Sequence, residues 1–219
     1  MRKKTNWFIF VTVMPGKKSE QTRQFIIEKA AALFNTKGYH GTSMADIMAA
    51  TGLTKGGIYG NFKIDSQDKK GVKEEIALAA FEYAVQEVNH HVRRRTGVID
   101  HSLDKLKAVV YFYKERILNP PIEGGCPILN SSTEADDNLP VLRDRVLEEL
   151  RTWHSKIVYT LHKGIERGEV RSDVAADDFA TLFIGSLEGG IMMARIYKDV
   201  KPFEIMARQL TQQIDNLRR

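Results

Sequence analysis

The chain has 219 residues, 42% apolar and 28% charged, a composition that suits a globular protein with a sizeable core and excludes a disordered one. Its net charge of +5 is unevenly spread: residues 1–63 carry ten Lys and Arg against three Asp and Glu, and residues 64–219 carry twenty-three against twenty-five. A basic first quarter on a near-neutral body indicates a polyanionic partner at one end of the molecule.

The first residues resemble a targeting segment only in part. Basic residues and an apolar run imitate a signal peptide, but no small-residue cleavage site precedes Pro15. We therefore interpret residues 1–18 as a tail without regular structure. No run in the sequence approaches the roughly 18 apolar residues of a membrane span, so no membrane partner is expected. Cys126 is the only cysteine, which excludes an intrachain disulfide and fits a reducing cytoplasm.

The first predicted helix covers about residues 19–37, where apolar residues recur at helical spacing, and Gly38 ends it. Its buried stripe is expected to pack beneath the short helices that follow. The first of these begins at Ser43, a suitable N-cap, and Asp46 three positions later is placed to complete a capping box. This helix is predicted to end at Gly52, since glycine readily adopts a left-handed conformation.

A second short helix follows after a tight turn. Thr54 is predicted to cap it, and Ile58 and Phe62 are expected to turn inward. The outward face then carries small, hydroxyl and basic residues. A helix with such a face fits the major groove of DNA.

This region carries a pattern formed by Gly38-Tyr39, Gly41-Thr42-Ser43, Gly57-Ile58-Tyr59 and Asn61-Phe62-Lys63. In residue type and spacing it resembles the DNA-binding domain of the TetR family of bacterial one-component regulators. The resemblance implies a three-helix helix-turn-helix domain at residues 19–63. It also implies a regulator, most often a repressor, that binds a palindromic double-stranded DNA operator as a homodimer. A small-molecule or thiol-reactive inducer would release it, and no cofactor is implied.

Several side chains of this domain are expected to contact DNA. The start of the second short helix suits base edges and nearby phosphates, its end suits the backbone, and hydroxyls at the N-terminus of the first suit a phosphate. Ser43 is equally suited to capping its helix alone, and both roles stay open. The candidates are Thr54, Lys55 and Gly56 near the bases, Tyr59 and Lys63 on the backbone, Thr42 and Ser43 at phosphate, and Asn61 beside them.

Residues 64–72 depart from the family pattern. They are polar, rich in turn residues and interrupted by Gly71, so they predict a linker loop before the body. The body, residues 73–219, is expected to be the ligand-binding and dimerisation domain. Its helical periods fall at about 73–95, 103–117, a short stretch after residue 126, 140–168, 177–197 and from 202 onward. With no credible strand, the fold class is all-α.

The family resemblance implies a small-molecule pocket in this body, although the sequence does not identify the inducer. Large aromatic side chains are candidates to line it, but an aromatic at helical spacing is more often part of a core. The candidates are Tyr111, Phe112, Trp153 and Tyr159.

A second candidate is Cys126, within Gly125-Cys126-Pro127-Ile128-Leu129-Asn130. This segment resembles one branch of the family whose members sense electrophiles or oxidants through a cysteine at that place. A thiol after two glycines is expected to be accessible, and the N-terminus of the following helix is expected to lower its pKa. A buried, unreactive cysteine is the alternative.

Small residues between 185 and 194 permit close approach of two helices and resemble the dimer helix of the family. One helix-turn-helix reads only a few base pairs, which also favours a dimer. Packing within one chain is the alternative role for these glycines. The interface candidates are Phe183, Ser186, Leu187, Gly190 and Ala194.

Two other classes of function compete with a specific regulator. For an enzyme, the sequence lacks His-Glu-x-x-His, Gly-x-Ser-x-Gly, a phosphate-binding glycine loop and Cys-x-x-Cys. No spacing of acids and histidines predicts a metal site. A sequence-neutral architectural DNA-binding protein is the second alternative, and competition with random DNA separates it from a reader of one operator.

Overall fold

The computed structural model describes residues 15–62, 71–118 and 120–219, and over these ranges it is helical apart from turns and one isolated bridge between Val170 and Arg218. Most of the expected tail, Lys63 and most of the expected linker lie outside them. The described helices are α1 (Pro15–Gly41), α2 (Met44–Thr51), α3 (Lys55–Tyr59), α4 (Gly71–Thr96), α5 (Ser102–Leu118), α6 (Pro127–Asn138), α7 (Pro140–Glu166), α8 (Ala176–Tyr197) and α9 (Lys201–Asp215).

Two helices begin a few residues earlier than the sequence predicted. Helix α1 begins at Pro15, so residues 15–18 are helical and not part of a tail. Proline suits the first turn of a helix because the amide it lacks would be unpaired there. Helix α4 begins at Gly71, two residues before the expected start of the body at residue 73. Gly38, with φ 74° and ψ 173°, interrupts α1 where the sequence predicted its end.

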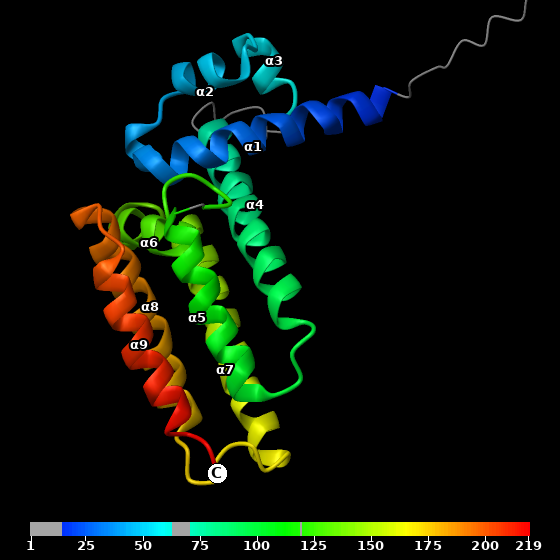
Figure 1. Cartoon of the computed structure of the whole chain (residues 1–219). Coiled ribbons are helices and arrows are strands. Elements are labelled where there is room, and N and C mark those ends of the chain that lie inside the picture. Colours follow the sequence, from blue (N-terminus) through cyan, green and yellow to red (C-terminus); the bar gives the residue numbers. More distant parts are fainter. Residues whose placement is uncertain (1–14, 63–70, 119) are drawn as a thin grey trace, which may run out of the picture.

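The helix-turn-helix region and the body share α4. Figure 1 shows α1, α2 and α3 at one end, with α4 running from beneath α1 along the bundle of the remaining helices. Residues Ile76 and Ala80 of α4 belong to a core with α1, α2 and α3, whereas Val88, farther along, belongs to the core of the body. One rigid helix therefore contributes to both cores.

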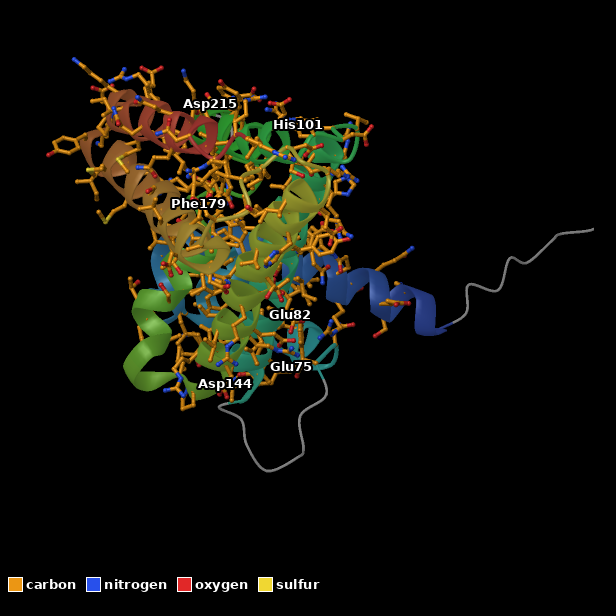
Figure 2. All side chains as sticks on the ribbon, turned by 90° about the horizontal axis from the view of Figure 1, so that it is seen from below. Glu75, Glu82, His101, Asp144, Phe179 and Asp215 are labelled. Atoms are coloured by element: carbon orange, nitrogen blue, oxygen red, sulfur yellow. The ribbon has the colours of Figure 1, made fainter. Side chains whose placement is uncertain are left out.

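The body packs around α8. Phe183 and Leu187 of this helix and Phe203 of α9 are fully or almost fully buried. In Figure 2, Phe179 of α8 lies toward the middle of the group of helices, while Asp144 of α7 lies at its edge. Within the described ranges, α8 alone is long and apolar enough to cross a membrane by length and composition. Nine of its residues are buried against neighbouring helices, as in the core helix of a globular domain.

Candidate nucleic-acid interface and ligand cavity

The turn between α1 and α2 is held by the predicted capping box. Ser43 Oγ accepts a hydrogen bond from the Asp46 amide at 3.1 Å, and Asp46 Oδ2 accepts one from the Ser43 amide at 2.8 Å. Lys37 Nζ lies 2.7 Å from the second carboxylate oxygen. Hydrogen bonds from Lys37 and Ser43 hold the pKa of Asp46 well below its ordinary value. Gly52, at φ 68°, ends α2 in the predicted left-handed conformation.

Helix α3 has one anchored face and one free face. Its N-cap, Thr54, accepts a hydrogen bond from the Gly57 amide at 3.2 Å. Ile58 and Phe62 are buried as predicted, in the core shared with α1 and α4. Thr54 and the first two residues of α3 are consequently exposed, and the Lys55 ammonium lies 5.3 Å from the centre of the half-buried Tyr59 ring.

Two of the candidate DNA contacts serve the domain itself. Thr42 is 0% exposed and its hydroxyl donates to the Gly38 carbonyl at 2.7 Å, so the expectation that it faces phosphate is wrong. The hydroxyl instead pairs with a partly buried carbonyl where α1 is interrupted. Asn61 Nδ2 donates to the Gly57 carbonyl at 2.7 Å, and its Oδ1 accepts from Ser19 Oγ at 3.0 Å. Both polar atoms of its side chain therefore hold the end of α3 in place.

A buried polar contact, not foreseen from the sequence, joins the helix-turn-helix end to the body. Asn35 of α1 donates from Nδ2 to the carbonyls of Glu123 and Gly125, at 2.8 and 3.2 Å. Asn130 of α6 donates to the Asn35 side-chain oxygen at 3.0 Å and to its backbone oxygen at 2.9 Å. A side chain at Gly124 would place Cβ 2.3 Å from the Asn35 carbonyl oxygen. We call this group of residues the Asn35 joint.

The Asn35 joint continues toward the centre of the body. The Gly125 carbonyl also accepts a hydrogen bond from Arg116 Nη2 of α5, at 2.5 Å. A second contact between the same parts runs from the Tyr39 amide to the Glu134 carboxylate of α6. The Gly125 carbonyl therefore accepts hydrogen bonds from both α1 and α5. The only sequence signals were a polar residue within the apolar pattern of α1 and a pair of glycines far along the chain.

The body contains a cavity of about 250 Å³ between α4, α5, α6, α7 and α8. Its lining is mostly apolar, with polar and charged side chains from α4, α5 and α7. An apolar cavity with a few polar groups is the usual form of a small-molecule site. No group of three or more His, Cys, Asp or Glu side chains suited to a metal ion occurs in the part of the chain that the structure describes.

Of the four aromatic candidates for the ligand site, two line the cavity and two do not. Trp153 and Tyr159 line the cavity. Tyr111 is 51% exposed and Phe112 is buried against the His91 ring, 6.4 Å between centres; neither lines the cavity, so their assignment to it is wrong. Tyr113, which does line it, was overlooked. The signal was available, because Tyr113 continues the helical spacing of the apolar Leu106 and Val110, whereas Tyr111 and Phe112 do not fall on that spacing.

Cys126 also lines the cavity, but it does not have the properties expected of a sensor. Its side chain is 2% exposed. Burial, followed by the nearby Glu188 carboxylate, raises the pKa of the Cys126 thiol far above its ordinary value. Burial also raises the pKa of Glu188, against opposing effects of Cys126 and Arg116. Both expectations, an accessible thiol and a lowered pKa, are therefore wrong, because desolvation outweighs the position at the start of α6.

The face of α8 chosen for the dimer interface points into the body. Of the five candidates, Phe183, Leu187, Gly190 and Ala194 are buried within one chain, and only Ser186 is partly exposed. A side chain at Gly190 would meet the Phe203 ring at 2.9 Å, so this glycine serves the close packing of α8 on α9. Packing within one chain is therefore the role of the four buried candidates.

Comparison with known proteins agrees with this architecture. The family model described as "Bacterial regulatory proteins, tetR family" matches residues 26–64, and "Tetracyclin repressor-like, C-terminal domain" matches residues 102–210. The HTH-type transcriptional repressor DhaR of Mycobacterium sp. strain GP1 is 25% identical over 183 residues, which cover 83% of this chain and 86% of DhaR.

Two solved structures are more similar. A TetR transcriptional regulator from Chloroflexus aurantiacus is 40% identical, with a TM-score of 0.85 over 93% of this chain and 98% of that chain. A TetR family regulator from Cytophaga hutchinsonii is 33% identical, with a TM-score of 0.81 over 92% and 96%. These relatives are transcriptional regulators rather than enzymes. The predicted resemblance and the all-α fold class are confirmed, and the chain belongs to the TetR family of bacterial transcriptional regulators.

Proposed function

We propose that this protein is a cytoplasmic repressor that binds a palindromic operator as a homodimer and leaves it when a small molecule occupies the cavity. The observation that carries the proposal is the free face of α3. Thr54, Lys55 and Gly56 are exposed at the start of this helix, while Ile58 and Phe62 fix its orientation from beneath. A reading helix must be held rigidly, because a displacement of about an ångström loses hydrogen bonds to bases.

The chemistry of this face suits DNA. Gly56 has no atom within 4 Å of the place where a side chain would begin, so its backbone is open to close approach. Lys55 supplies a positive charge, and Tyr59 beside it supplies a hydroxyl for the sugar-phosphate backbone. The exposed Ser43 at the N-terminus of α2 offers a further phosphate site, in addition to its role as a cap.

Dimerisation is supported by a different face of α8 from the one first expected. Leu182, Met192 and Ile196 of this helix are exposed, with Ile196 at 80%. Gly185 and Gly189 lie among them and have open space where a side chain would begin. Large apolar side chains separated by small residues form a surface against which a second helix packs closely. We define these five residues as the α8 outer face and propose that two copies pair through it.

The Asn35 joint supports a route from the cavity to the DNA. Cys126 lines the cavity and the adjacent Gly125 carbonyl is bonded to Asn35 in α1. A ligand that displaces the segment around these residues would move α1, and with it the core that holds α3. A ligand shifts such an equilibrium only through its different affinity for the two arrangements.

The experiment is a gel-shift titration with DNA from upstream of the protein's own gene, against random-sequence competitor, at several salt concentrations. We expect a complex that survives competition and weakens steeply with salt. Lys55→Ala is expected to weaken operator binding at least about tenfold. The matched control is Lys29→Ala, at an exposed position of α1. Equal affinity for the upstream and random DNA would favour the architectural alternative.

The oligomeric state is tested separately by light scattering. The native protein is expected at twice the 24.9 kDa of one chain, and Ile196→Glu at the mass of one chain. Val98→Glu, an equally drastic change at an 86% exposed position between α4 and α5, should remain a dimer. If Ile196→Glu leaves the mass unchanged, the α8 outer face is not the interface.

A further inference from the structure

The cavity of the body has a strong bias in the charges that line it. Arg93 of α4, Lys105 of α5 and Lys156 of α7 are cationic, whereas Glu149 of α7 is the one carboxylate among the lining residues. Within the described residues, none of the three cations forms an ion pair. Cations elsewhere on the same helices do: Arg95 pairs with Glu115 on α5, Lys107 and Lys114 of α5 pair with α9, and Arg143, Arg145 and Lys163 pair within α7.

Most of the remaining lining is apolar, and part of it is formed by aromatic rings. Val88, Leu106 and Phe183 contribute aliphatic and aromatic surface. The rings of Trp153 and Tyr113 stack with 5.7 Å between centres and 14° between planes, and both line the cavity. Such a surface stabilises a ligand by removing its apolar area from water.

We propose that the effector of this cavity is an amphipathic organic anion, with an aromatic or aliphatic body of a size for about 250 Å³ and a carboxylate as its charged group. The inference rests on the proposed function, since it assigns a ligand class to the effector site. A carboxylate gains charge-assisted hydrogen bonds from cations that pair with no carboxylate among the described residues. A neutral ligand with a carbonyl accepts hydrogen bonds from the same cations but lacks the attraction between opposite charges, and a cationic ligand meets like charges on three helices.

The test compares three probes that differ only in their polar end: 4-phenylbutanoate, 4-phenylbutanamide and 4-phenylbutylammonium. The full chain has two tryptophans, so Trp7→Phe leaves the emission of Trp153 as the report of cavity occupancy. We expect the carboxylate to bind at least about tenfold more tightly than the amide, because only the carboxylate adds the attraction of opposite charges to these hydrogen bonds. The ammonium is expected to bind more weakly than the amide.

Substitutions then locate the source of the preference. Arg93→Gln and Lys156→Gln should each reduce the carboxylate-to-amide ratio severalfold, and Glu149→Gln should increase it. Arg94→Gln is the matched control, because Arg94 is exposed on the same helix but does not line the cavity. Unchanged ratios in the Arg93 and Lys156 variants, an equal effect of Arg94→Gln, tighter binding of the amide or ammonium, or no binding of any probe would each overturn the proposal.

The outcome is separable from that of the proposed function. Trp153 emission reports the probe without any DNA present. If the carboxylate is preferred but does not release the operator, the ligand class stands and the release mechanism fails. If the operator is bound specifically but the probes show no preference for the carboxylate, the regulator stands and the ligand class fails.

Discussion

The Asn35 joint is the contact whose loss should most directly loosen the DNA-binding end from the body. Asn35→Ala removes two hydrogen bonds donated by Nδ2 and one accepted by Oδ1, all at a side chain that is 8% exposed. Each buried hydrogen bond contributes about 1 kcal/mol net. The Gly125 carbonyl keeps its bond to Arg116, whereas the Glu123 carbonyl and the Asn130 amide each lose a partner. We therefore expect a loss of about 3 kcal/mol in the free energy of unfolding.

The assay is urea unfolding followed by circular dichroism, with Asn35→Ala, Asn130→Ala and the double variant forming a cycle. Because the two side chains share a hydrogen bond of 3.0 Å, their effects should fall short of additivity by at least about 0.5 kcal/mol. Thr36→Ala is the control. Thr36 is the exposed neighbour of Asn35, and its hydroxyl bonds only within α1, so a change of about 0.5 kcal/mol or less is expected.

Two results would refute this reasoning. The first is a loss at Asn35 no larger than at Thr36, which would mean that the joint contributes nothing beyond an exposed polar position. The second is strict additivity in the cycle with Asn130, which would mean that the two parts are coupled elsewhere. Operator affinity in the absence of effector should stay close to that of the native protein, because the side chain of Asn35 is not part of the apolar core beneath α3.

Three further predictions concern single positions. Ser43→Ala should lower the free energy of unfolding by about 1 kcal/mol through loss of the cap. Because the pKa of Asp46 is lowered from 3.8, the contribution of its carboxylate to stability is complete above about pH 4 and disappears only as pH falls toward the lowered pKa. Asp46→Asn should therefore abolish this acid dependence when urea unfolding is measured at several pH values. Cys126 should resist N-ethylmaleimide in the native protein at pH 7 and react once urea unfolds the chain. Rapid labelling of the native protein, followed by mass spectrometry, would contradict the burial of its thiol. Gly124→Ala, at φ 112° and with Cβ 2.3 Å from a carbonyl oxygen, should lower the free energy of unfolding by more than about 2 kcal/mol. Gly56→Ala, where the added Cβ meets open space, should leave stability unchanged and weaken operator binding instead.

Local features were predictable from the sequence because a few neighbouring residues encode them. The capping box of Ser43 and Asp46, the left-handed Gly52 and the inward Ile58 each depend on contacts within one or two turns of helix. The all-α class and the family followed from the period of apolar residues and from the helix-turn-helix pattern. The basic charge of residues 1–63 likewise followed from the numbers of Lys, Arg, Asp and Glu alone.

Only the tertiary structure decided which residues face which neighbour. Helix α8 carries apolar residues on two sides, and its period does not say whether Phe183 or Ile196 is buried in the chain. Cys126 looked accessible beside two glycines, yet the helices of the core bury it, and this burial, followed by the carboxylate of Glu188 62 positions away, raises the pKa of its thiol. The Asn35 joint connects residues 88 to 95 positions apart. A sequence pattern reports the period of a helix, whereas burial and pKa depend on what the other helices bring into contact with it.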